Sequence, residues 1–114
     1  FLYWKPHQIP KVNLGFIRAI YKAQQNIRHK ATIDVPLLVL FSDKSVDEKQ
    51  WSEKLQFADA VLSVKQIKTV AEKINGDVTT CEIKNAHHDV VLSKKHFREK
   101  AYQKIFEWTA AKIT

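Results

Sequence analysis

The stretch VPLLVLF, residues 35–41, constrains the fold more than any other part of the sequence. An uninterrupted apolar run of this length predicts a strand buried on both faces, as in a parallel sheet. Pro36 has no N–H to donate, so we expect it at the first position of this strand. The alternating, β-rich stretch VTTCEIK predicts a second strand over residues 78–84.

Helical patterns alternate with these strands. Apolar residues at a spacing of about 3.6 predict helices over residues 11–30, 64–75 and 94–113, with a helical turn or two within 47–57. Gly76 stands where a left-handed cap of the second helix belongs. The order helix, strand, helix, strand, helix predicts an α/β fold, in which βαβ-type parallel strands are flanked by helices.

Scarcity of glycine excludes several common enzyme motifs. The 114 residues correspond to about one small domain and include two glycines, Gly15 and Gly76. Neither the phosphate-binding motif G-x-x-x-x-G-K-[ST] nor the dinucleotide motif G-x-G-x-x-G can be written with them. The nucleophile elbow G-x-S-x-G of serine hydrolases is also absent from this sequence.

The net charge of +7 permits binding to an anionic partner, but the basic residues are scattered. Their densest groups, within residues 28–30 and 94–100, fall where helix ends or solvated faces are expected. We therefore expect no nucleic-acid partner. We also expect no transmembrane segment, because no apolar run reaches about 18 residues. The single cysteine, Cys81, lies in an apolar alternating run, which predicts a buried free thiol and favours the reducing cytoplasm.

Two strands are too few for an independent parallel sheet. We expect the sheet to be completed by another segment or chain, and exposed strand edges make self-association an expected property. The apolar face of the helix at 11–30 adds to that expectation. The aromatic lead-in FLYWKPHQIP, residues 1–10, is expected to be irregular and to pack on other residues.

Acidic and histidine side chains follow the two predicted strands. Functional residues of open α/β sheets lie in the loops at the carboxyl ends of the strands. Asp43 and Asp47 come soon after the first strand and Asp59 further on, while His87 and His88 follow the second strand. An acid followed by a histidine is the second half of the chain order Ser, Asp, His. In that arrangement the carboxylate holds the imidazole in one tautomer, so that it can take a proton from a serine hydroxyl.

These residues carry a resemblance to a known family. The stretches VPLLVLFSDKS, ADAVLSVKQI, VTTCEIKNAHHDVVLS and FEWTAAKI resemble the C-terminal part of an α/β-hydrolase. The group that they resemble contains lysophospholipases, monoglyceride lipases and serine aminopeptidase-like enzymes. The resemblance covers residues 33–113, and residues 11–30 are similar to the helix after the lid. It implies a lead-in and post-lid helix over residues 1–32 and a C-terminal hydrolase segment over 33–114, as parts of one larger domain.

The resemblance implies particular site residues. Residues 85–88, NAHH, match the family motif G-A-x-H and place His88 at the catalytic position. The family acid follows its strand as G-x-x-D, and here that alignment places Ser45 where the acid belongs. The stretch beginning at Asp59, DAVL, resembles the family's D-x-V-V, as if an insertion over residues 44–58 had displaced the acid. Asp59 is therefore the predicted acid, with Asp43 and Asp47 as alternatives.

The function implied by the resemblance is that of a serine hydrolase fragment. His88 and Asp59 would supply the base and the acid of a Ser-Asp-His triad that acts on a small ester or an acyl lipid. The nucleophile and the oxyanion hole would belong to an N-terminal half, so this chain alone would be inactive. No cofactor or metal is expected, because adjacent residues such as His87 and His88 point apart on an extended chain. The alternatives are a small basic α/β binding module and a hydrolase relative that has lost catalysis, which Ser45 suggests.

Overall fold

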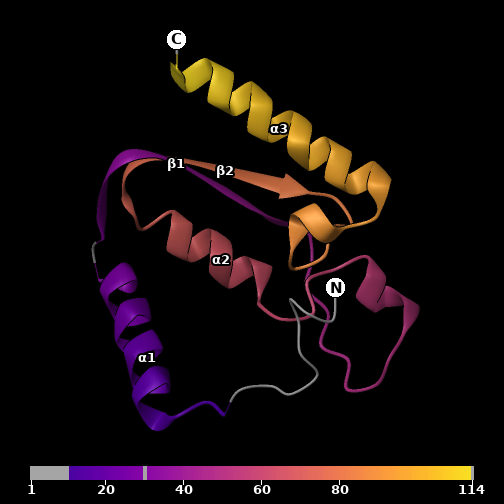
Figure 1. Ribbon diagram of the computed structural model, residues 1–114, viewed down its shortest axis with the longest axis horizontal. Coiled ribbons are helices and arrows are strands. Elements are labelled where there is room, and N and C mark those ends of the chain that lie inside the picture. Colours follow the sequence, from indigo (N-terminus) through magenta and orange to yellow (C-terminus); the bar gives the residue numbers. More distant parts are fainter. Residues whose placement is uncertain (1–10, 30, 114) are drawn as a thin grey trace.

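The computed structural model describes residues 11–29 and 31–113. The predicted lead-in, residues 1–10, lies outside the described residues. Helices and strands alternate along the chain as expected, which confirms a small α/β fold (Figure 1). In chain order the elements are α1 (Leu14–Arg28), β1 (Thr32–Ser42), η1 (Glu53–Gln56), α2 (Val64–Ala71), β2 (Asn75–Ile83), η2 (Val90–Leu92) and α3 (Lys95–Ile113).

Strands β1 and β2 run parallel and form a two-stranded sheet within the described part of the chain. Helices α2 and α3 lie on opposite sides of this sheet, and α1 lies beyond α2 (Figure 1). The last residue of β1, Ser42, pairs with the last residue of β2, Ile83. The loops that follow the two strands therefore begin side by side at one edge of the sheet.

Several predicted boundaries were wrong. The helical turns expected within 47–57 reduce to the short 3-10 helix η1, and α2 ends at Ala71 rather than at residue 75. Strand β1 begins at Thr32, so Pro36 lies inside the strand and not at its first position. The register shifts between Ile33 and Leu37, and this irregularity accommodates a residue that cannot donate to the sheet.

Gly76 does not cap α2, contrary to the prediction. It lies near the start of β2 with φ 148° and pairs with Ile33 of β1. A Cβ atom at this position would lie 2.4 Å from the carbonyl oxygen of Ile33. Glycine is required here because the two backbones approach closely and because other residues rarely adopt this φ.

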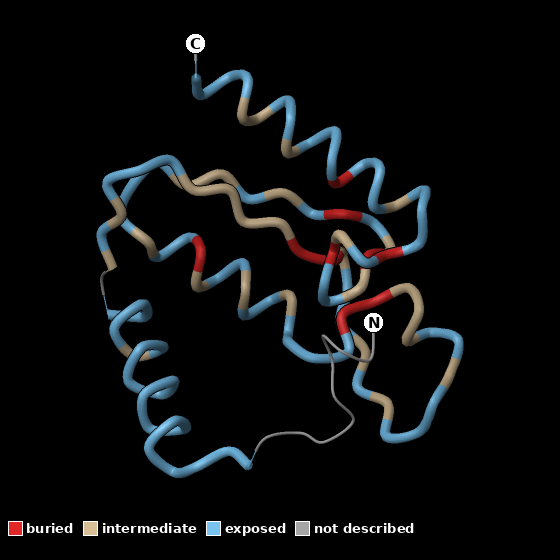
Figure 2. Tube along the Cα trace, viewed as in Figure 1, coloured by how far each residue is buried: buried red, intermediate tan, exposed pale blue. Residues whose placement is uncertain are grey.

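The core lies at the carboxyl end of the sheet, beneath α3. Its buried cluster joins Ile83 at the end of β2, Ala86 from the following loop, Val90 of η2 and Ala101 of α3. Figure 2 shows that most buried residues gather at this end. Cys81 is half-buried against the cluster and is a free thiol. The core therefore fixes the loop that carries the two predicted histidines.

The rest of the sheet is incompletely covered. The centre of β1, residues 37–40, is only half-buried, so the expectation of a strand buried on both faces was wrong for the described structure. The physical reason is that a single helix covers each side of the sheet. None of the residues of α1 is buried, and apolar side chains such as Phe16 and Ile20 are exposed. No helix in the described residues is long and apolar enough to cross a membrane.

We predict that Gly76→Ala lowers the free energy of unfolding by about 1–3 kcal/mol, because the new Cβ would collide with the Ile33 carbonyl in a strained conformation. Urea unfolding measures this change. The control is Gly15→Ala in the first turn of α1, where the nearest atom is the end of the exposed Asn13 side chain. That control should change stability by less than about 1 kcal/mol. Equal effects of the two substitutions would contradict the prediction.

Candidate active site

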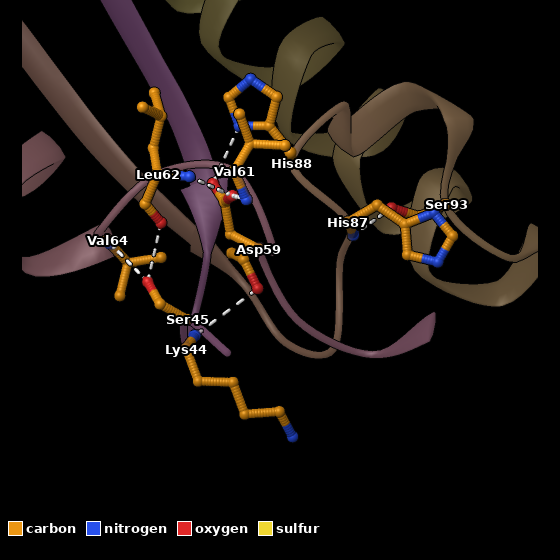
Figure 3. Close-up of polar contacts among 10 residues, drawn as sticks. Lys44, Ser45, Asp59, Val61, Leu62, Val64, His87, His88 and Ser93 are labelled. Atoms are coloured by element: carbon orange, nitrogen blue, oxygen red, sulfur yellow. Dashed lines mark hydrogen bonds and ion pairs between the residues drawn. The ribbon is translucent and has the colours of Figure 1, made fainter. Parts of the chain in front are cut away.

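Asp59 and His88 come together at the carboxyl end of the sheet. The Nδ1 atom of His88 lies 2.9 Å from Oδ2 of Asp59 (Figure 3). Asp59 lies on the segment that leads into α2, and His88 lies in the loop after β2. The two residues come from separate loops, as an acid and a base at the edge of a parallel sheet do.

The carboxylate of Asp59 is buried and fully engaged. Asp59 is only 1% exposed, and its Oδ1 atom accepts hydrogen bonds of 2.8 Å from the N–H groups of both Val61 and Leu62. Burial by itself would raise the pKa of Asp59. The hydrogen bonds from the two amides and from the His88 ring outweigh that effect, so the pKa of Asp59 lies below its ordinary value. Asp59 is therefore an ionised acceptor for the imidazole.

His88 presents its second ring nitrogen away from the acid. A carboxylate can only accept, so Nδ1 carries the proton and donates it to Asp59. In the neutral ring, Nε2 then keeps its lone pair, and Figure 3 shows this nitrogen directed away from Asp59. The side chain is 42% exposed. This arrangement leaves Nε2 able to accept a proton from a group that approaches from outside.

The main chain explains how Asp59 reaches this position. Asp59 pairs with Ser45 in an isolated parallel bridge. The Asp59 N–H donates to the carbonyl of Lys44, and the Val46 N–H donates to the carbonyl of Asp59, each at 2.9 Å. The chain therefore leaves the sheet edge after Ser45 and returns beside it at Asp59. We call the intervening residues 46–58 the inserted loop, after the insertion that the sequence resemblance implies over residues 44–58.

Ser45 supports the same segment as the acid. Its Oγ donates to the carbonyl of Leu62 at 2.9 Å and accepts from the N–H of Val64 at 2.7 Å (Figure 3). Asp59 also binds the N–H of Leu62. Both side chains thus stabilise the turn that begins α2. The Ser45 hydroxyl forms its two hydrogen bonds with main-chain groups of that turn.

The alternative acids lie elsewhere. Asp43 accepts a hydrogen bond of 2.7 Å from the N–H of Asn85. It thus stabilises the start of the loop after β2 that carries His87 and His88, which we call the histidine loop. Asn85 has φ 58°, a left-handed conformation that asparagine tolerates. Asp47 is exposed in the inserted loop. Of the three predicted carboxylates, the structure brings only Asp59 into hydrogen-bond contact with His88.

His87 and Ser93 have contacts that the sequence did not indicate. The ring of His87 lies against the inserted loop, with Nε2 2.8 Å from the carbonyl oxygen of Gln56. Its main-chain N–H donates to the Oγ of Ser93, which is buried. No local pattern marks either contact, because the partners are a backbone carbonyl far along the chain and a serine placed before a helix. Within residues 11–29 and 31–113, no group of three or more His, Cys, Asp or Glu side chains could share a metal ion.

Ionisation of Asp59 should make stability depend on pH. Because its pKa is lowered in the folded state, the stabilisation is fully present above the unfolded value of about 4. It is lost as the pH falls through the lower folded value. We expect the free energy of unfolding of the wild type, measured in urea, to decrease as the pH is lowered below about 4. In Asp59→Asn this decrease should be less steep. Asp47→Asn should retain the wild-type slope, and an unchanged slope in Asp59→Asn would refute the assignment.

No protein-family model, curated protein or solved structure matches the chain. The contact between Asp59 and His88 and the resemblance of the sequence motifs are the features of this chain that bear on its function.

Proposed function

We propose that this chain supplies the acid and the base of a serine hydrolase acting on carboxylic esters. The observation that carries the proposal is the hydrogen bond between buried, ionised Asp59 and Nδ1 of His88. The resemblance to α/β-hydrolases adds the nucleophilic serine and the oxyanion hole, which would belong to a segment outside these 114 residues. That segment is the partner that the proposal requires.

In this proposal His88 acts first as a base and then as an acid. Nε2 takes the proton of the serine hydroxyl as its oxygen attacks the ester carbonyl, and the imidazolium then protonates the departing alcohol. Water attacks the resulting acyl-enzyme by the same proton transfers and releases the carboxylic acid. Asp59 remains ionised throughout and stabilises the imidazolium. The resemblance favours a small ester or an acyl lipid as substrate.

A hydrolase relative without catalysis is the second candidate, because Ser45 stands where the family keeps its acid. The position of Asp59 argues against that candidate, because Asp59 pairs with Ser45 in the main chain and its carboxylate accepts a hydrogen bond from His88. Labelling of the longer protein by a fluorophosphonate probe distinguishes the two. Labelling supports the hydrolase, and no labelling of folded protein supports the inactive relative.

The chain by itself should not hydrolyse p-nitrophenyl acetate above the background of free histidine. The reason is that a base and an acid without a nucleophile and oxyanion donors lack the groups that form and stabilise the tetrahedral intermediate. Initial rates for the purified chain, compared with His88→Ala, measure this. Turnover at triad level by the pure chain would contradict the proposed division of the site.

In the longer protein that carries the serine, Asp59→Asn should lower kcat by about 10³–10⁴-fold, because the imidazole loses its orienting carboxylate. Ester hydrolysis under saturating substrate measures the effect. Asp47→Asn is the matched control and should stay within about 2-fold, as expected for an exposed loop carboxylate. A small effect at Asp59 together with a large loss in Asp43→Asn would transfer the role of acid to Asp43.

A further inference from the structure

The inserted loop contacts the histidine loop at a second place, next to the hydrogen bond between Asp59 and His88. The ring of His87 bonds the carbonyl of Gln56, near the end of the inserted loop. The next residue, Phe57, packs edge-on against Phe97 of α3, with ring centroids 6.3 Å apart. The Nζ atom of Lys94 lies 4.0 Å from the centre of the Phe57 ring. These contacts hold the end of the inserted loop just before it reaches Asp59.

The two adjacent histidines thus link the same two segments. His87 binds at Gln56, and His88 binds three residues further along, at Asp59. The bond of His88 joins the two groups proposed for proton transfer, whereas the bond of His87 ends on a backbone carbonyl. Since the His88 side chain is 42% exposed, surrounding side chains enclose it only in part. Its geometry toward Asp59 therefore depends on how the two segments are held together.

The histidine side of this link is well anchored. Ser93 accepts the main-chain N–H of His87 at 2.8 Å, and the intervening turn buries Val90. Ala86, on the other side of His87, is completely buried in the core. The inserted loop buries Ala58 next to Asp59, and its other residues are half-buried or exposed. Besides the main-chain bonds that join its base to the end of β1, its contacts at Gln56 and Phe57 therefore hold it beside His88.

We propose that His87 is a positioning residue, whose Nε2–H bond to the Gln56 carbonyl keeps Asp59 in register with His88. A carbonyl oxygen can only accept, so His87 donates from Nε2 in both its neutral and its protonated forms. The link is therefore compatible with both the neutral and the protonated ring of His87. The positioning role concerns the described chain, and its catalytic consequence rests on the proposed function.

The direct test observes the Nδ1 proton of His88 by NMR in the 114-residue chain labelled with ¹⁵N-histidine. His87→Gln retains an N–H at the place of Nε2, whereas His87→Leu has none. His87→Asn is a second, polar variant whose amide is too short to replace Nε2. We expect the hydrogen-bonded proton signal in the wild type and in His87→Gln, and its loss in His87→Leu and His87→Asn. His29→Leu, an exposed histidine at the end of α1, is the control and should retain the signal.

Two results would overturn the proposal. One is a wild-type Nδ1 proton signal in folded His87→Leu or His87→Asn, which would show that the link is dispensable. The other is loss of the signal in His87→Gln, which would show that the N–H donor is not what matters. Urea unfolding of each variant identifies a loss that comes from unfolding, and His87→Asn then supplies the decisive comparison.

Ester hydrolysis by the longer protein tests the catalytic consequence separately. His87→Leu should lower kcat by about 10–100-fold, as a displaced catalytic group does, and His87→Gln should restore most of it. Unchanged kcat in His87→Leu would overturn the catalytic part of the proposal. Because the NMR signal needs no nucleophile, failure of the positioning role and failure of the proposed hydrolase are distinguishable.

Discussion

The backbone pairing of Asp59 with residues 44–46 is the constraint on which the rest of the site depends. Two hydrogen bonds return the chain to the edge of the sheet after a long excursion. Without them the carboxylate would belong to a loop whose ends are free to separate. With them, Asp59 lies beside Ser45, just beyond the end of β1, where its carboxylate reaches His88.

Burial of a carboxylate at that position is stable only because its acceptors are filled. An ion removed from water loses several kcal/mol of solvation, which hydrogen bonds from charged or polar donors must offset. Asp59 receives the N–H groups of Val61 and Leu62 on one oxygen and the His88 ring on the other. The same bonds begin the turn into α2, so the charge that would serve proton transfer also shapes the fold around it.

The sequence predicted the alternation of helices and parallel strands, because periodicity of apolar residues is a local signal. The contact between Asp59 and His88 followed from motif resemblance and not from periodicity. Gly76 and Pro36 were misplaced, since their local signals fit a helix cap and a strand start, and the pairing of β1 with β2 determines their true positions. The contact of His87 with Gln56 had no local signal at all, because it joins residues from two loops distant in the sequence.

Closure of the inserted loop at its own base has a consequence for how such a site can change over evolution. The entropy of closing a loop grows only slowly with its length, and the tip at Trp51 is 74% exposed. Residues can therefore be added or removed near that tip while the base at Ser45 and Asp59 stays joined. In a site built in this way, the carboxylate is defined by its place beside the sheet. The number of residues between the preceding strand and that carboxylate can therefore vary.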